Sequence, residues 1–226
     1  MTLCEYAVDE RVSTITMDDG KANVLSPAML AEINAALDRA EKDDVVAVVL
    51  AGRPGRFSGG FDLAVLRGGG PEAEGMLRGG FELAERLLGF PKPVVIACTG
   101  HAMAMAVFLL CSGDHRVGAA GDFKIQANEV AIGLTMPYAA LAIVRYRLTG
   151  PAFDRAVGLS ALFTPEDAVA AGFLDEVVEP DAVVSRAQSV AASFAALDPA
   201  AHAGSKLRAR ATVLAEIRRA IDDGNR

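Results

Sequence analysis

The pattern of apolar and polar residues divides the early part of the chain into a strand, a helix and a second strand. β-Branched runs bounded by Asp and Gly are typical of strands, and they occur as RVSTITMD (11–18) and VVAVVLAG (45–52). Between them, Ser26 and Pro27 open a segment that extends to residue 44 with apolar residues at helical spacing. Ser at the cap and Pro at the first helical position predict a helix that begins there.

The segment after the second strand is rich in glycine, and we expect it to be irregular and mobile around residues 68–75. An amphipathic helix is predicted over residues 76–90, with a broad apolar face made by Met76, Leu77, Phe81, Leu83, Ala84, Leu87 and Leu88. Pro91 and Pro93 end this helix.

The most apolar part of the chain, Val94 to Cys111, is about as long as a membrane-spanning segment. Its first half, within PVVIACTG (93–100), is β-branched, and the turn at Gly100 and His101 separates it from AMAMAVFLLCSG (102–113). This pattern predicts a buried strand, a turn and a buried helix, followed by a short strand in DHRVGAA (114–120). We therefore expect no membrane span.

The last third of the chain is predicted to be mainly helical. Residues 151–179 indicate a helix, a second helix capped by Thr164 and a short strand, and further helices are expected over 185–199 and 205–224. Strands that alternate with helices pair in parallel through right-handed crossovers. The predicted fold class is therefore α/β, with both faces of the sheet covered.

Composition narrows the class of protein. Hydrophobic residues make up 52% of the 226 residues, as in a globular chain, and the net charge of −7 argues against a nucleic-acid partner, because phosphate contacts need clustered Lys and Arg. The cysteines are three in number and mostly lie in apolar runs, which is typical of a reducing cytoplasm. No CxxC or HExxH spacing indicates a metal site. The opening MTLCEYAVDE is acidic where a signal peptide is basic, so export is not expected.

Two glycine-containing turns each connect a predicted strand to a predicted helix. One is RFSGGFDL (56–63) and the other is TGHA (99–102). In a parallel sheet such turns lie at the carboxyl ends of the strands, where ligands bind. Backbone N–H groups from two such turns can converge on one oxygen, which is what an oxyanion hole requires.

Four segments in this order and spacing resemble the crotonase superfamily, the enoyl-CoA hydratases and isomerases, over about residues 5–200. They are GRFSGGFDL (55–63), PKPVVIACTGHAMAMAVFLLCSGDHRV (91–117), FKIQANEVAIGLTMP (123–137) and LTGPAFDRAVGLSALFTPEDAVAAGFLDEVV (148–178). The segment QANEVAIG (126–133) is similar to the matching segment of actinobacterial members named enoyl-CoA hydratase.

The resemblance implies a crotonase-like β-β-α spiral core over residues 1–195 and a C-terminal helical oligomerisation region over 196–226, which is short for the family. It implies a cytoplasmic homotrimer or hexamer that acts on an acyl thioester of coenzyme A, with no cofactor besides the coenzyme A that the substrate carries. The thioester oxygen would accept hydrogen bonds from the backbone N–H groups of Phe61 and Met105. Fatty acid metabolism is the expected context.

The resemblance also exposes a departure. Family hydratases use two glutamates, and the matching positions here are Glu129 and Phe108. Ala104, Met105 and Ala106 stand where the family usually has glycines. One carboxylate can still move a proton between two carbons, so isomerisation or weak hydration is expected with Glu129 as acid and base. A catalytically impaired acyl-CoA-binding protein and a structural subunit of a two-glutamate partner are the alternatives.

Other residues have both a functional and a structural interpretation. His101 lies near the lost acid position and the acyl pocket, but a polar residue hydrogen-bonded at a turn explains it as well. The resemblance assigns coenzyme binding to Lys21, Ala22, Phe57 and Gly59.

We expect Asp62 to cap the next helix and Asp114 to pair with backbone or with Arg116. The basic cluster Lys206, Arg208, Arg210, Arg218 and Arg219 either contacts phosphate or forms an exposed helix face, and we favour the exposed face.

Overall fold

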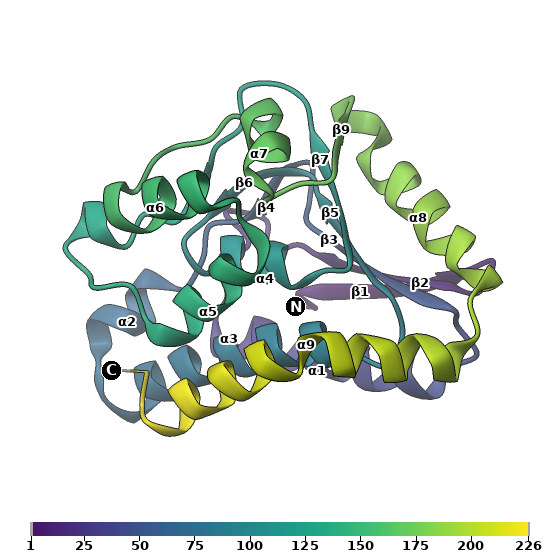
Figure 1. The fold of residues 1–226 in the computed structure, drawn as a ribbon, viewed down its shortest axis with the longest axis horizontal. Coiled ribbons are helices and arrows are strands. Elements are labelled where there is room, and N and C mark those ends of the chain that lie inside the picture. The colour runs from purple at the N-terminus through teal and green to yellow at the C-terminus, as the bar shows by residue number, and fades with distance from the viewer. Residues whose placement is uncertain (1, 226) are drawn as a thin grey trace.

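A computed structural model describes residues 2–225, in which two sheets of unequal size are surrounded by helices (Figure 1). The larger sheet has six strands in the spatial order β1 (Cys4–Asp9), β2 (Val12–Met17), β3 (Ala47–Ala51), β5 (Val94–Cys98), β7 (His115–Ala119) and β9 (Glu176–Val178). β1 pairs antiparallel with β2, and the other neighbours pair in parallel. The smaller, parallel sheet contains β4 (Gly55–Ser58), β6 (Gly100–Met103) and β8 (Ile125–Gln126).

The two sheets are built by a repeating unit. Each of β3, β5 and β7 in the larger sheet is followed along the chain by a strand of the smaller sheet, β4, β6 or β8. Helical segments come next: α2 (Leu63–Gly68) and α3 (Gly70–Gly89) after β4, α4 (Met105–Ser112) after β6, and the 3₁₀ turn η1 (Val130–Ile132) after β8. This order confirms the predicted β-β-α spiral.

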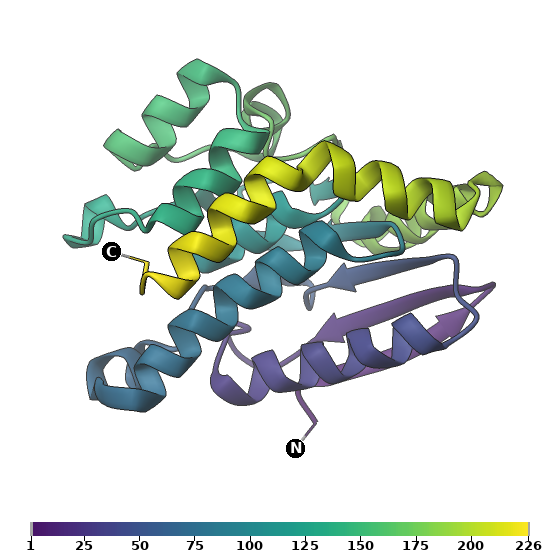
Figure 2. The same ribbon diagram turned by 60° about the horizontal axis from the view of Figure 1, so that its bottom comes forward.

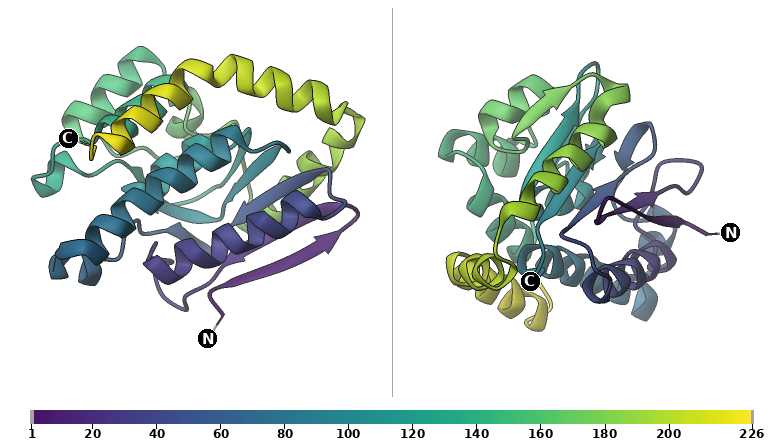
Figure 3. Two further views of the ribbon diagram at one scale, coloured as in Figure 1. Left: turned by 90° about the horizontal axis from the view of Figure 1, so that it is seen from below. Right: turned by 90° about the vertical axis from the view of Figure 1, so that its right-hand side faces the viewer.

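Alternating side chains of the larger sheet divide the interior into two apolar layers. In β3, Val48 and Leu50 join the main core, whereas Val49 faces the second layer. Helix α8 (Val183–Ser193) covers the second layer, and α1 (Pro27–Lys42) packs on the other face (Figure 3). The Ser26 hydroxyl accepts a hydrogen bond from the Met29 N–H, as the predicted cap of α1 requires.

The C-terminal third is helical, as predicted. It contains α5 (Tyr138–Arg147), α6 (Gly150–Leu159), α7 (Pro165–Ala171), η2 (Pro180–Ala182), α8, η3 (Phe194–Ala196) and α9 (Pro199–Asp222). Helix α9 lies against α3 and α5 and sends Val213, Ile217, Ala220 and Ile221 into the main core (Figure 2). The predicted division at residues 195 and 196 falls within η3.

Three local predictions were wrong. Strand β1 was not predicted, because its residues are mostly exposed and CEYAVD carries no β-branched run. Residues 70–75 are helical rather than irregular, because Pro71 and Glu72 lie in the first turn of α3. The buried helix begins at Met105 rather than at residue 102, because residues 100–103 form β6.

The run that resembles a membrane span is thus divided among β5, β6 and α4. In the described part of the chain, no helix combines the length and the apolarity needed to cross a bilayer.

All three cysteines are free and buried. Burial raises the pKa of the Cys4 thiol to about 12, aided by the nearby charge of Glu32. Burial also raises the pKa of Cys98 to about 12 and that of Cys111 to about 11. The thiols therefore stay protonated and act as small apolar groups of the core.

Candidate active site

The three predicted reaction groups follow the three strands of the smaller sheet. Phe61 comes after β4, Met105 after β6 and Glu129 after β8. Because these strands are parallel, their carboxyl ends lie at one edge of the sheet, which is where α/β proteins bind ligands. The Ala104 N–H donates to the Gln126 carbonyl at 2.9 Å, so the turns after β6 and β8 are joined directly.

The Phe61 and Met105 N–H groups belong to two turns that touch at Gly60. A Cβ atom at Gly60 would lie 2.8 Å from the Met103 carbonyl oxygen and 3.4 Å from the Met105 nitrogen, and Gly60 has a φ of +86°. Only glycine permits this approach. Neither the Phe61 N–H nor the Met105 N–H donates a hydrogen bond within residues 2–225. Two free donors therefore lie on neighbouring segments, as an oxyanion hole requires.

Glu129 is buried, with 7% of its surface exposed. Its Oε2 atom is enclosed and has no hydrogen-bond partner within the described residues. Burial raises the pKa of Glu129, and a hydrogen bond from its own backbone N–H offsets part of this rise. A carboxyl group that is enclosed, unpaired and more easily protonated than usual is suited to exchange protons with a bound molecule.

Sequence reasoning missed the neighbour of this carboxyl group. The Oδ1 atom of Asn128 is also enclosed without a partner in the described part of the chain. Two such acceptors on adjacent residues indicate a place where a donor group or a water molecule binds. The only sequence signal was the position of Asn128 beside Glu129.

Aromatic side chains fill the space around the start of α4. The Phe81 ring stacks on Phe108 with centroids 6.0 Å apart and meets Phe61 edge-on at 6.4 Å. A Cβ at Gly80 would lie 2.4 Å from the Phe61 ring, so α3 admits this ring only because residue 80 is glycine. Phe108 is 1% exposed. The position of the lost acid is therefore apolar and closed.

His101 lies near the beginning of β6 rather than at its carboxyl end. Its Nδ1 atom accepts a hydrogen bond of 3.0 Å from the Lys124 N–H, and its ring meets Phe123 edge-on. Burial and the nearby Arg56 and Lys124 charges lower the pKa of His101. These contacts agree with the structural interpretation of His101, because they bind it to the segment just before β8, away from the turn that carries Met105.

The predicted coenzyme-binding residues come together. The Asp19 carboxylate accepts hydrogen bonds from the N–H groups of Lys21, Asn23 and Val24 and thereby shapes the loop before α1. Burial alone would raise the pKa of Asp19, but these N–H groups lower it below its ordinary value.

This loop contacts β4 and the turn that follows it. The Gly59 N–H donates to the Ala22 carbonyl at 2.8 Å, and the Asn23 amide donates to the Phe57 carbonyl at 3.3 Å. The Lys21 side chain is exposed, and the Phe57 side chain is fully buried, so Phe57 offers only its backbone. Lys21, Ala22, Phe57 and Gly59 therefore belong to two segments that contact each other beside the Gly60 turn.

The prediction for the basic C-terminal cluster was wrong for two of its members. Lys206 and Arg210 point inward from α9 and bind Asp114 at 2.6 and 2.7 Å, with side chains 3% and 8% exposed. Burial lowers the pKa of Lys206 to about 8 although Asp114 opposes this change. Asp114 also accepts the Val94 N–H, as predicted, whereas Arg116 pairs with Asp175 instead.

Asp62 and Arg218 lie where the sequence predicted them, at a helix cap and on an exposed helix face. Asp62 caps α2 as predicted, with its carboxylate accepting the Ala64 N–H at 2.8 Å. The exposed Arg218 pairs with Glu85 on α3.

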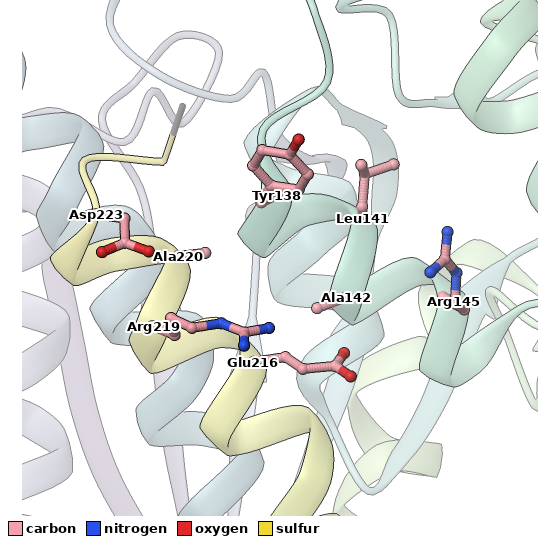
Figure 4. Close-up of a pocket in the computed structure, with 8 residues that line it drawn as sticks. All are labelled: Tyr138, Leu141, Ala142, Arg145, Glu216, Arg219, Ala220 and Asp223. Carbon is pink, nitrogen blue, oxygen red and sulfur yellow. The ribbon is translucent and has the colours of Figure 1, made fainter.

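A surface cavity of about 370 Å³ lies between α5 and α9 (Figure 4). Its lining comes from the two helices and from the residue that follows α9: Tyr138, Leu141, Ala142, Arg145, Glu216, Arg219, Ala220 and Asp223. None of the residues predicted for the reaction or the coenzyme lines this cavity.

Comparison with known proteins finds a family model and a relative that both carry the name enoyl-CoA hydratase. Residues 7–222 match the family model described as enoyl-CoA hydratase/isomerase. A protein of Mycobacterium avium named "Probable enoyl-CoA hydratase echA17" is 33% identical over 231 residues, covering 95% of this chain and 88% of its own length.

Solved structures agree with this match but carry two kinds of name. An enoyl-CoA hydratase from Mycobacterium marinum is 55% identical, covers 98% of this chain and 97% of its own, and has a TM-score of 0.94. A Mycobacterium tuberculosis protein described in one structure as an enoyl-CoA isomerase is also 55% identical, covers 99% of this chain and 97% of its own, and has a TM-score of 0.95. Another structure of the same protein describes it as a probable enoyl-CoA hydratase. These proteins share the fold with this chain, and their names divide between water addition and double-bond migration.

Proposed function

The chain belongs to the enoyl-CoA hydratase/isomerase family, and on this basis we propose that it moves a double bond in an enoyl-CoA thioester from position 3 to position 2. It is an enzyme of the hydratase/isomerase type. The observation that carries the choice of isomerisation is the buried Glu129 carboxyl group, whose Oε2 atom has no partner among residues 2–225, together with an aromatic residue, Phe108, at the position of the first family glutamate.

The reaction uses one proton acceptor that becomes the proton donor. The thioester oxygen accepts hydrogen bonds from the Phe61 and Met105 N–H groups, which favours loss of a proton from C2. Glu129 takes that proton, and the C2–H electron pair becomes part of a dienolate whose negative charge lies on the thioester oxygen. Each N–H stabilises this charge by about 3 to 4 kcal/mol. Glu129 then returns the proton to C4, which leaves the double bond between C2 and C3.

Water addition is disfavoured at this site. Hydration requires one group that activates water and another that delivers a proton to the neighbouring carbon. Phe108 can do neither, and its stacking on Phe81 leaves that side of the site apolar. We therefore propose at most weak hydration, with Asn128 as the neighbouring polar side chain that would hold a water molecule.

Coenzyme A is proposed to lie along the loop of residues 18–24 and the turn after β4. The backbones of Ala22, Phe57 and Gly59 offer polar groups to the adenine and pantetheine, and Lys21 offers a charge to a phosphate. We also propose fatty acid metabolism in the cytoplasm as the context and a homotrimer or hexamer as the assembly, which sedimentation would test.

Product analysis tests the reaction. Purified protein is incubated separately with 3-enoyl and 2-enoyl thioesters of coenzyme A, and the products are examined by mass spectrometry and NMR. We expect the 3-enoyl substrate to give the 2-enoyl isomer with unchanged mass. Rapid addition of water to the 2-enoyl substrate would overturn the argument from Phe108. Binding of both thioesters without conversion would favour the acyl-CoA-binding alternative.

A further inference from the structure

Ala104, between β6 and α4, has an unusual backbone conformation. Its φ is 50° and its ψ is −124°. These angles match the first central residue of a type II′ turn, where glycine is preferred because a side chain is strained there. Ser160 also has a positive φ, but its angles of 46° and 42° are those of an ordinary left-handed residue. The conformation of Ala104 is harder for a residue with a side chain to adopt.

The backbone of Ala104 connects the elements that carry the proposed reaction groups. Its N–H donates to the Gln126 carbonyl on β8, three residues before Glu129, and its carbonyl accepts the Val107 N–H of α4, both at 2.9 Å. The next residue is Met105, whose N–H donates to no group among the described residues. The direction of this N–H is therefore set largely by the conformation of Ala104.

The methyl group of Ala104 faces the opposite turn. It lies 3.0 Å from the position that a Cβ atom would take at Gly60, so it meets the bare side of that glycine. Phe61, the other proposed donor, follows Gly60 directly. One methyl group therefore stands between the two turns whose N–H groups must meet a single oxygen.

We propose that Ala104 is a positioning residue whose methyl group, held at positive φ, sets the separation and direction of the Phe61 and Met105 N–H groups. It touches no reacting atom and acts through these two donors. The inference rests on the proposed function, because it concerns the same thioester oxygen. Glycine would relieve the backbone strain at position 104, and strain of this kind is retained where the surrounding structure needs the geometry.

The substitution Ala104→Gly separates positioning from packing. It relieves the backbone and removes only the methyl group, so the melting temperature is expected to stay the same or to rise. The value of kcat for 3-enoyl-CoA is expected to fall about tenfold, with a smaller change in KM, because misplaced donors stabilise the dienolate less well. Glu10→Gly is the matched control, since Glu10 also has a positive φ and lies in the exposed β1–β2 hairpin.

Infrared spectroscopy measures how strongly the two N–H groups polarise the thioester carbonyl. A purely structural role of Ala104 would leave this polarisation unchanged. Saturated butanoyl-CoA, labelled with carbon-13 at the thioester carbonyl, is bound to each variant, and the carbonyl stretch is compared with that of the free thioester. Wild type and Glu10→Gly are expected to lower the carbonyl stretching frequency of the bound thioester by the same amount. Ala104→Gly is expected to lower this frequency by a smaller amount. Ala104→Ser, which keeps a Cβ atom, is expected to lower it almost as much as wild type does.

The outcomes separate the inference from the function on which it rests. A full frequency shift and unchanged kcat in Ala104→Gly would overturn the role of Ala104 while leaving the oxyanion hole intact. A lower melting temperature in Ala104→Gly would show that the methyl group serves packing and would also overturn it. The absence of any shift in wild type would overturn the proposed oxyanion hole itself.

Discussion

Phe108 on α4 stacks on Phe81 of α3 with ring centroids 6.0 Å apart, and this contact fills the position at which the family resemblance leads us to expect a glutamate. A carboxylate there would lose its hydration and would find no basic partner among these rings. The aromatic pair therefore stabilises the packing of two helices and makes this position apolar.

Phe108→Ala is expected to destabilise the protein by about 3 to 5 kcal/mol, because the removed ring leaves a cavity between α3 and α4. Urea unfolding followed by circular dichroism measures this change. Leu77→Ala on α3 is the control, since Leu77 is exposed and its truncation should have a much smaller effect. Equal losses in the two variants would contradict the assigned packing.

Glu129→Gln is expected to lower the isomerisation rate by about two to four orders of magnitude, the range for removal of a general acid or base. Acyl-CoA binding should persist, because the backbone donors and the coenzyme loop are unchanged. Isothermal titration with butanoyl-CoA and a rate assay in deuterated water measure the two properties. Glu179→Gln, at an exposed position, is the control. Unchanged isomerisation in Glu129→Gln would remove the proposed mechanism.

The raised pKa of Glu129 predicts how stability changes with pH. Between the ordinary pKa of 4.5 and the raised folded value, the folded state binds more protons than the unfolded state, so the free energy of unfolding decreases as pH rises. Glu129→Gln lacks this group. The variant should therefore gain stability relative to wild type on going from mildly acidic to mildly alkaline buffer. A stability difference that is independent of pH would show that Glu129 has an ordinary pKa.

Gly60→Ala is expected to abolish activity and to destabilise the chain by more than about 1 kcal/mol, because φ is positive and the new methyl would meet the Met103 carbonyl. Gly69→Ala, between α2 and α3, is a matched control with a φ of +65° and open space around the residue. The control reports the strain of positive φ alone. If both variants retained full activity, the close approach of the two turns would not matter for catalysis.

Asp114→Asn is expected to destabilise the protein by about 3 to 5 kcal/mol, because it leaves the buried Lys206 and Arg210 charges without their counter-charge. Thermal melting measures the loss. Asp222→Asn, which removes an exposed partner of Arg78 and Arg218, should change stability by at most about 1 kcal/mol. A small effect at Asp114 would mean that α9 is held by apolar packing alone.

Local signals in the sequence predicted the longer buried strands and most of the helices, and they predicted the order in which the candidate site residues follow one another. The Ser26 cap, the β-branched runs and the turns after β4 and β6 are each encoded within a few residues. Strands β4, β6 and β8 were not predicted, because four residues or fewer carry no periodicity and are defined only by pairing with distant strands.

The contacts that could not be predicted join positions far apart in the chain. Lys206 and Asp114 are 92 residues apart, and a basic residue on an amphipathic helix ordinarily faces solvent. The conformation of Ala104 was also hidden, since an alanine before a helix gives no indication of a positive φ. In both cases the tertiary structure overrides the local preference.

The buried thiols have a practical consequence for measurement. Because Cys4, Cys98 and Cys111 are enclosed and protonated, a maleimide dye should leave them unmodified in the folded protein. A cysteine introduced at the exposed Val130, next to Glu129, would then be labelled selectively without removing any native cysteine. Such a fluorophore would report the arrival of an acyl group beside the acid in real time.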